Sequence, residues 1–304
     1  MILSFLLGLT MMRPGERIVA DSDQPSASLA AQQPGPLKFG PPVLGPDDKP
    51  AFPPAPVGFD LPREGVPKGK VETLDYESKS VGTTRHLVVY TPPGYTKENS
   101  YPVLYLLHGI GGTEREWLDN ASPNAILDNL LADSKIAPMI VVFPNGRAEK
   151  NDRPEGNIYA HAPAFAKFDK DLLNDVIPFI ESKYSVKKGA ENRALAGLSM
   201  GGGQSLNFGL ANLDTFAWVG GFSSAPNTLA PEALVPEPEK AIKNLKLLWL
   251  SCGDQDGLIA ISQKLHLFLN QKNVPHIWHV DAGAHVFPVW KNDLYLFAQR
   301  IFRP

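Results

Sequence analysis

The stretch Arg193-Ala-Leu-Ala-Gly-Leu-Ser-Met-Gly-Gly-Gly-Gln204 decides the fold of this chain. A short apolar run, Ala194 to Ala196, leads into Gly197-Leu-Ser-Met-Gly201, and a helix is expected from Gly202 onwards. The result is the pattern Gly-x-Ser-x-Gly between a strand and a helix. A serine lifted clear of its neighbours needs a strained turn, and side chains at the two glycine positions would collide with the adjoining strand and helix. The stretch therefore predicts a nucleophilic serine, Ser199, at the end of a strand.

The overall composition fits one folded domain with a tail. The chain has 304 residues, of which 43% are hydrophobic and 20% charged, and its net charge is −3. This length suits an α/β domain of about 230–250 residues. The nearly balanced charge does not favour nucleic acid or an anionic membrane surface as a partner. The single cysteine, Cys252, excludes an intramolecular disulfide and a multi-cysteine metal site; we interpret it as a small buried residue.

The N-terminal part differs in composition from the rest. Residues 1–12 are apolar and about as long as the core of a signal peptide, although no lysine or arginine precedes them. They are too few to span a bilayer as a helix. We therefore predict that residues 1–30 are an export signal, or else a disordered N-terminus, and that the protein is secreted or periplasmic. Residues 31–67 are rich in proline and predict a linker or extended tail that tethers the folded domain, residues 68–304, or lies along it.

Apolar runs and helical patterns alternate through the folded part. We expect a first antiparallel pair of strands joined around Gly82, then buried strands separated by helices. The expected strands are 71–78, 85–91, 103–107, 139–143, 194–196, 218–222, 245–252 and 276–280, and the expected helices are 125–132, 165–184, 258–270 and 289–302. Residues 146–163 are polar and patternless and predict a surface loop. The alternation predicts a mostly parallel, doubly wound sheet flanked by helices, in which sites lie at the carboxyl ends of strands.

A Gly-x-Ser-x-Gly turn in such a sheet is the nucleophile elbow of α/β-hydrolases, so we predict the α/β-hydrolase fold. In this fold the catalytic order along the chain is serine, acid, histidine. His266 falls inside an expected helix, and His276 and His279 fall inside the last strand, where packing or surface roles are favoured. His285 follows that strand in a loop that can turn its imidazole towards Ser199. We predict that His285 is the base that takes the serine proton.

Two aspartates are candidates for the acid that orients this base. Asp254 and Asp256 both follow the strand that ends near Cys252. Their position therefore does not choose between them. A carboxylate at such a place also commonly caps a turn or a helix, which is the alternative role for Asp254.

A glycine-rich turn that precedes Ser199 in the chain predicts one of the two N–H donors of an oxyanion hole. The run Leu107-His-Gly-Ile-Gly-Gly112 lets the backbone approach a substrate, and the N–H of Ile110 would pair with that of Met200. His108 stands too early in the chain for the catalytic order, and we interpret it as a residue that braces this loop. Trp117 and Trp290 either wall an acyl pocket or are core aromatics, and both interpretations remain open.

Four segments together resemble a known family. They are His108-Gly-Ile-Gly-Gly112, Gly197-Leu-Ser-Met-Gly-Gly-Gly-Gln-Ser205, Cys252-Gly-Asp-Gln-Asp256 and Gly283-Ala-His285. In order and spacing they resemble the esterase-D-like branch of α/β-hydrolases, most of all the feruloyl esterase modules of carbohydrate esterase family 1 that accompany xylanases. The resemblance covers about residues 70–302. It implies that Asp256 is the acid, His285 the base, and Ile110 and Met200 the oxyanion donors.

The resemblance implies a serine carboxylic-ester hydrolase that acts on acylated plant polysaccharide through an acyl-enzyme intermediate, without metal or organic cofactor. Within the same family it also allows an acetylxylan esterase, a siderophore esterase, an S-formylglutathione-type thioesterase or an acyltransferase. A carbohydrate-binding relative without catalysis is the alternative from another class. The intact set of Ser199, Asp256 and His285 disfavours that alternative.

Overall fold

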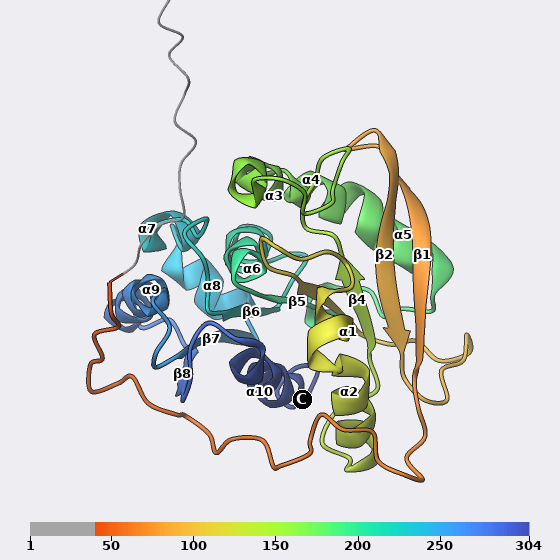
Figure 1. The fold of residues 1–304 in the computed structure, drawn as a ribbon, viewed down its shortest axis with the longest axis horizontal. Helices are drawn as coiled ribbons and strands as arrows, with labels where there is room; N and C mark the ends of the chain where they lie inside the picture. Colours follow the sequence, from red (N-terminus) through yellow and green to blue (C-terminus); the bar gives the residue numbers. More distant parts are fainter. Residues whose placement is uncertain (1–39, 304) are drawn as a thin grey trace, which may run out of the picture. The chain divides into compact units, whose positions relative to one another are not determined.

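Eight strands form one β-sheet at the centre of the folded domain (Figure 1). The computed structural model describes residues 40–303; the predicted export signal and residues 31–39 of the predicted linker lie outside the described residues. The strands are β1 (Lys70–Ser78), β2 (Thr83–Thr91), β3 (Val103–Leu107), β4 (Ile140–Pro144), β5 (Arg193–Leu198), β6 (Trp218–Phe222), β7 (Leu247–Gly253) and β8 (Ile277–Asp281). Every strand predicted from the sequence is present, with small shifts at the ends.

The strand order is β1-β2-β4-β3-β5-β6-β7-β8. β1 pairs antiparallel with β2, and β2 antiparallel with β4, whereas all other pairs are parallel. β3 and β6 are buried along their whole length, as expected of parallel strands that helices cover on both faces. The parallel arrangement places the carboxyl ends of β3, β5, β7 and β8 at one edge, where the candidate residues follow them.

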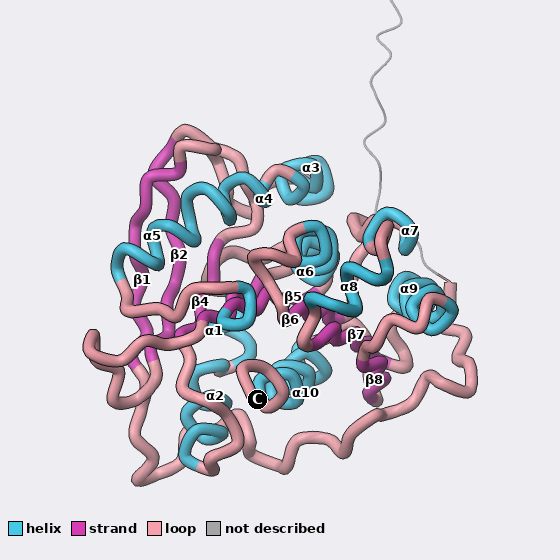
Figure 2. The backbone as a smooth tube through the Cα atoms, turned by 180° about the vertical axis from the view of Figure 1, so that it is seen from behind, coloured by secondary structure: helices cyan, strands magenta, loops and turns pink. Residues whose placement is uncertain are grey.

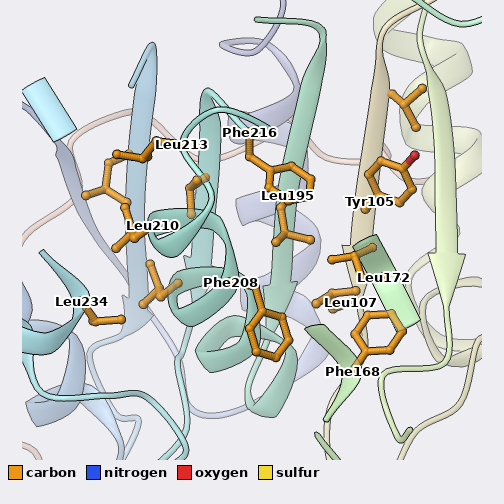
Figure 3. Close-up of a cluster of buried hydrophobic side chains, with 14 of the residues drawn as sticks. Tyr105, Leu107, Phe168, Leu172, Leu195, Phe208, Leu210, Leu213, Phe216 and Leu234 are labelled. Atoms are coloured by element: carbon orange, nitrogen blue, oxygen red, sulfur yellow. The ribbon is translucent and has the colours of Figure 1, made fainter. Parts of the chain in front are cut away.

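Helices cover both faces of the sheet (Figure 2). They are α1 (Glu116–Ala121), α2 (Pro123–Ala132), α3 (Ala162–Ala166), α4 (Phe168–Asp171), α5 (Ile177–Lys183), α6 (Met200–Ala211), α7 (Pro231–Leu234), α8 (Pro238–Asn244), α9 (Ile259–Gln271) and α10 (Phe287–Ala298). One core lies between the sheet and α5, α6, α8 and α9 (Figure 3), and a second lies between the sheet and α1, α2 and α10. The doubly wound arrangement predicted from the sequence is thereby confirmed.

The helices differ from the predictions in three places. The predicted helix 165–184 is divided by a π-helical turn at Leu172–Val176, because Pro178 has no N–H to continue the regular bonding. The last helix ends at Ala298 rather than at residue 302. Helices α1, α7 and α8 were not predicted, since four to seven residues are too few to show a period.

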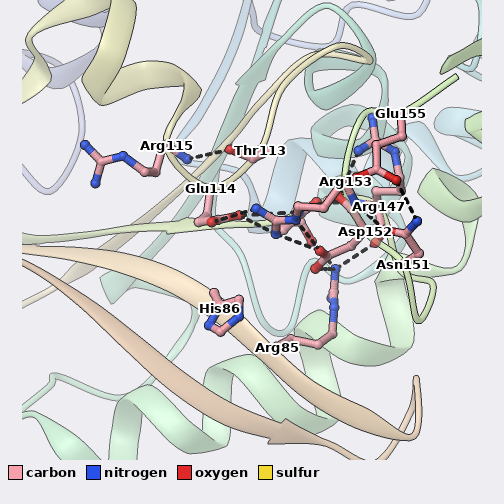
Figure 4. A network of polar contacts seen from close by, with 12 residues as sticks. Arg85, His86, Thr113, Glu114, Arg115, Arg147, Asn151, Asp152, Arg153 and Glu155 are labelled. Carbon is pink, nitrogen blue, oxygen red and sulfur yellow. Dashed lines mark hydrogen bonds and ion pairs between the residues drawn. The ribbon is translucent and has the colours of Figure 1, made fainter.

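The prediction that residues 146–163 form a surface loop is wrong for its first part. Arg147 is fully buried, and Asp152 is 8% exposed. Both side chains have polar partners inside the protein: the Arg147 guanidinium donates to the backbone carbonyl of Asp152 (2.9 Å), and the Asp152 carboxylate pairs with Arg153 (2.6 Å) and with Arg85 of β2 (3.4 Å). Figure 4 shows this polar network. The polar composition of residues 146–163 indicated a surface loop, because a local sequence pattern does not show hydrogen-bond partners that come from other elements.

Residues 40–67 form no helix or strand, and they lie along the domain as part of the same compact unit (Figures 1 and 2). Lying along the domain is one of the two alternatives that the sequence left open. Phe52 stacks on Trp249 of β7 with ring centroids 5.9 Å apart, and Phe59 meets Tyr295 of α10 edge-on at 5.3 Å. The N–H of Val280 in edge strand β8 donates to the carbonyl of Lys49 (3.1 Å). We call residues 40–67 the N-terminal strap.

Asp293 of α10 is a fully buried carboxyl group whose two oxygens have no hydrogen-bond partner among the described residues. Burial, together with the nearby charge of Asp281, raises the pKa of Asp293 well above its usual range. The folded state therefore keeps a proton that the unfolded chain releases above about pH 4. Because the native state binds the extra proton, the contribution of Asp293 to the free energy of unfolding is fully present below pH 4 and falls as the pH rises towards the folded-state pKa.

We therefore expect Asp293→Asn to be stabilised relative to the wild type as the pH rises above about 4. One linked proton corresponds to a slope of about 1.4 kcal/mol per pH unit between the unfolded and folded pKa values. Urea unfolding of both proteins at several values between pH 4 and pH 8 measures the difference. Parallel pH profiles of the two proteins would show that Asp293 is ionised in the folded state.

Candidate active site

Ser199 lies on a sharp turn between β5 and α6. Its backbone has φ 52° and ψ −118°, a conformation that non-glycine residues rarely adopt. A Cβ atom at Gly197 would lie 2.7 Å from the carbonyl of Gly201, and one at Gly201 would lie 2.5 Å from the carbonyl of His108. Glycine is thus required at both positions, as the sequence predicted. The turn holds the Ser199 hydroxyl at the edge of the sheet.

The three predicted side chains lie in hydrogen-bonding contact. His285 Nε2 is 3.0 Å from Ser199 Oγ, and His285 Nδ1 is 2.7 Å from Asp256 Oδ2. Ser199 follows β5, Asp256 follows β7 and His285 follows β8, so the carboxyl ends of three parallel strands bring them together. This arrangement can relay a proton from a serine hydroxyl to an imidazole that a carboxylate orients.

The environments of the two aspartates differ in a way that the sequence could not show. Asp256 is 1% exposed, and its Oδ1 accepts a hydrogen bond from the N–H of Leu258 (2.8 Å). Burial acts to raise the pKa of Asp256, but its hydrogen bonds and the charge of His285 outweigh burial and lower the pKa below the usual value. Asp256 is therefore ionised at neutral pH. Asp254 instead accepts a hydrogen bond from the N–H of Gly283 (2.8 Å) and braces the loop that carries His285.

The two predicted oxyanion donors lie on adjacent backbone segments. A Cβ atom at Gly109 would lie 3.5 Å from Ser199 Cβ, which shows how closely the loop after β3 approaches the serine. The amides of Ile110 and Met200 donate to no acceptor among residues 40–303. The N–H of Gly109, by contrast, is bound by Glu116 of α1 (2.7 Å). Two free amides beside the serine can accept the charge of a tetrahedral intermediate.

Neither predicted tryptophan lines the pocket beside Ser199. Trp117 is buried in the core, where its indole N–H donates to the carbonyl of Leu107 (3.0 Å). Trp290 meets the His285 imidazole edge-on, with ring centroids 4.8 Å apart, and so supports the histidine from behind. Of the two interpretations, the buried positions of both residues fit the core-aromatic one. Each side chain packs towards the core, because α1 and α10 cover the sheet face with those positions.

A cleft of about 590 Å³ opens beside Ser199 and His285. Its walls combine the loop after β3, the 158–162 segment, and the segments after β6 and β7. The apolar lining residues are Ile110, Tyr159, Ala162, Ala225, Pro226 and Leu258. Sequence reasoning missed the last five, because they lie in loops without period and meet only in the folded chain. No lysine or arginine among the described residues lines this cleft.

Two further buried side chains fix the loops around the cleft. Gln204 of α6 donates to the carbonyls of Gly146 (2.9 Å) and Phe165 (2.7 Å). Arg147 donates to the carbonyl of Ile110. In the sequence, a charged or amide residue close to a predicted buried strand or helix is only a weak indication that its side chain fixes a loop. Within residues 40–303, no group of three His, Cys, Asp or Glu side chains converges as metal ligands, and no helix is long and apolar enough to cross a membrane.

The sheet order, the serine turn and the positions of the histidine and aspartate define the class: this is an α/β-hydrolase fold. A family model described as "Putative esterase" matches residues 78–296, and the chain belongs to this esterase family. It is a serine esterase of the α/β-hydrolase fold.

Known relatives show which esterases this chain is similar to. The chain is 31% identical, over 79% of its length, to an endo-1,4-beta-xylanase/feruloyl esterase of Xylanibacter ruminicola, and it spans about a third (32%) of that protein. Its structure is similar to that of the carbohydrate esterase family 1 ferulic acid esterase of Anaeromyces mucronatus, with a TM-score of 0.73 and 26% identity over 82% of this chain and 96% of the other. The same fungal esterase is known in complex with ferulic acid, and that structure gives a TM-score of 0.72. The resemblance to carbohydrate esterase family 1 is thus confirmed.

Proposed function

We propose that this protein hydrolyses esters between an aromatic acid of the ferulic type and plant polysaccharide. The observation that carries the proposal is an apolar cleft directly beside the Ser199, His285 and Asp256 side chains, which lie in mutual hydrogen-bonding contact. The relatives from Xylanibacter ruminicola and Anaeromyces mucronatus are named as feruloyl and ferulic acid esterases, which supports the same class of substrate.

The proposed mechanism is acyl transfer in two steps. His285 takes the proton of Ser199 as the hydroxyl attacks the ester carbonyl, and the N–H groups of Ile110 and Met200 bind the oxyanion. The imidazolium then protonates the departing sugar alcohol, which leaves an acyl group on Ser199. His285 next removes a proton from water, which attacks the acyl-enzyme and releases the acid. Asp256 stays ionised throughout and holds the proton of the imidazole on Nδ1.

The volume and the apolar lining of the cleft favour an aromatic acyl group over a small or charged one. Its volume of about 590 Å³ falls within the range of sites that enclose small molecules of many heavy atoms. An acetyl group would leave most of this volume to water. The carboxylates of a glutathione thioester would meet no cation on the described lining, so the thioesterase alternative is disfavoured.

An acetyl esterase acting on xylan is the second candidate. The cleft is open to solvent and does not exclude an acetyl group by size, so an acetylated polymer remains a substrate that the site can bind. Because polymeric plant substrates lie outside the cell, we also propose that the protein is exported, in line with the apolar residues 1–12.

Turnover of three esters tests the proposal. For the full chain we expect methyl ferulate to be hydrolysed with a kcat/KM at least tenfold above that for acetylated xylan, since the apolar cleft contributes binding energy only to the larger acyl group, about 0.8 kcal/mol per buried methylene equivalent. Turnover of p-nitrophenyl acetate measures ester cleavage by the catalytic residues without depending on a large acyl group. Ser199→Ala is the control and should abolish all three activities. Turnover of the acetyl esters without turnover of ferulate would replace the feruloyl assignment by the second candidate, and activity that survives in Ser199→Ala would remove the serine mechanism.

A further inference from the structure

The peptide unit that carries the Ile110 N–H is held by a buried side chain on its far side. In a trans peptide the N–H of Ile110 and the carbonyl of Gly109 point in opposite directions. The Gly109 carbonyl lies 2.7 Å from His108 Nδ1 and also accepts a hydrogen bond from the N–H of Gly112 (3.1 Å). Fixing this carbonyl therefore fixes the direction of the Ile110 N–H.

The contacts of His108 determine which of its nitrogens carries the proton. The carbonyl of Gly109 can only accept, so Nδ1 carries a proton and donates it to that carbonyl. Nε2 lies 2.9 Å from the N–H of Gly146 and 3.0 Å from Asn145 Oδ1. Burial lowers the pKa of His108 below its usual value, so the imidazole stays neutral at the pH where an esterase works.

The carbonyl of Ile110 itself is held by a second buried group. Arg147 is fully buried; its Nη2 donates to the Ile110 carbonyl, and its Nη1 donates to the carbonyl of Asp152 (2.9 Å). The guanidinium also lies 5.3 Å from the centre of the Phe165 ring. Arg85 donates to the backbone carbonyl of Arg147 (2.7 Å) (Figure 4). Two backbone carbonyls and the Phe165 ring thus hold the guanidinium, and Arg85 holds the main chain from which it extends.

We propose that His108 and Arg147 are positioning residues of the oxyanion hole. His108 orients the peptide unit before Ile110, and Arg147 orients the peptide unit after it, so that the Ile110 N–H faces the oxygen of the ester carbonyl that Ser199 attacks. This inference rests on the proposed function, because it assigns Ile110 as an oxyanion donor. Neither side chain lines the cleft, so both act through the backbone and not on the substrate.

The proposal predicts an effect on the rate rather than on substrate binding. The oxyanion forms only after attack, so a misdirected Ile110 N–H weakens the transition state and leaves the bound ester almost unchanged. Loss of one oxyanion donor costs about 10²–10³-fold in kcat, and a donor that is displaced but not lost costs less. We therefore expect a fall in kcat of about 10–100-fold, with KM changed by less than about twofold.

A pair of amide substitutions separates the two nitrogens of His108. The side-chain NH₂ of His108→Asn can take the place of Nδ1–H, whereas that of His108→Gln reaches the place of Nε2. We expect His108→Gln to lose about 10–100-fold in kcat with p-nitrophenyl acetate and His108→Asn to lose clearly less. His86→Gln, on the exposed part of β2, is the matched control and should keep the wild-type kcat. Equal losses in the two His108 variants, or a greater loss in His108→Asn, would overturn the assignment of Nδ1 as the positioning donor.

Arg147 is tested by Arg147→Lys and Arg147→Met with a probe that mimics the tetrahedral state. Phenylboronic acid adds to a catalytic serine and places an oxygen in the oxyanion hole, so its Ki should rise by the same factor by which kcat falls. Arg147→Lys, which keeps one donor and the charge, should recover part of both losses. Melting temperatures identify a variant that fails to fold, in which case the His108 pair decides. A KM increase with unchanged kcat and Ki would overturn the proposal.

The failure of the proposed function would look different. p-Nitrophenyl acetate tests the site whichever acyl group the enzyme prefers, so a wild type that cleaves it but not methyl ferulate contradicts only the substrate assignment. If the wild type cleaves neither ester, the assignment of Ile110 as an oxyanion donor is contradicted, and so is the proposed role of His108 and Arg147.

Discussion

Asp256→Asn is expected to lower kcat by about 10⁴-fold, whereas Asp254→Asn should lower it by less than about tenfold. The reason is the direction in which an amide at position 256 must lie. The N–H of Leu258 donates to Asp256 Oδ1, so the carbonyl oxygen of the new amide takes that place. Its NH₂ group then faces His285 Nδ1, where Asp256 Oδ2 now accepts. The imidazole must place its proton on Nε2, and it can no longer accept the proton of Ser199.

Asp254→Asn is the matched control because it makes the same chemical change two residues away. The Oδ1 atom of Asp254 accepts a hydrogen bond from the N–H of Gly283, and the carbonyl oxygen of asparagine can accept it equally well. Steady-state kinetics with p-nitrophenyl acetate measure both variants, and melting temperatures establish that both are folded. If Asp254→Asn lost as much activity as Asp256→Asn, the acid would not be Asp256 alone, and the resemblance that chose it would be misleading at this position.

The positions of the strands along the chain and the placement of Ser199 and His285 could be predicted from the sequence, since both depend on local signals. The apolar runs are continuous because parallel strands are covered on both faces, and a glycine on each side of the serine is a steric requirement that any sequence of this fold must meet. His285 was distinguished from three other histidines by one fact, namely that it follows the last strand in a loop. Each of these signals extends over only a few neighbouring residues in the sequence.

The choice of acid, the walls of the cleft and the buried arginines could not be predicted in this way. Asp254 and Asp256 differ only in what lies opposite them, Gly283 in one case and His285 in the other, and both partners lie some 30 residues further along the chain. Arg147 stands in a polar stretch that predicted a surface loop, and its burial depends on partners in other elements. Trp117 and Trp290 show the converse, because aromatic residues near a site in the sequence can still point into the core.

The N-terminal strap is expected to contribute several kcal/mol to the free energy of unfolding, although its proline-rich sequence predicted a linker or tail. Phe52 covers Trp249 and is itself covered by the guanidinium of Arg300, 3.4 Å from its ring centre. The N–H of Ala51 donates to the buried His279 (3.0 Å). We expect removal of residues 1–67 to cost about 3–5 kcal/mol relative to removal of residues 1–39, from lost apolar burial and hydrogen bonds. For a domain of this size that corresponds to a melting temperature lower by about 10 °C.

The comparison of the two truncations isolates the strap, because the version that begins at residue 40 keeps every contact described above. Phe52→Ala in the full chain should reproduce about 1–2 kcal/mol of the loss, since it removes one aromatic ring from a partly exposed site. Equal melting temperatures for the two truncations would mean that residues 40–67 are a tail that only rests on the domain. A large difference would instead mean that the folded unit begins well before residue 68. The strap would then have a physical purpose: it covers Trp249 and His279 and occupies part of the free edge of β8, which an eight-stranded open sheet otherwise exposes to pairing with other chains.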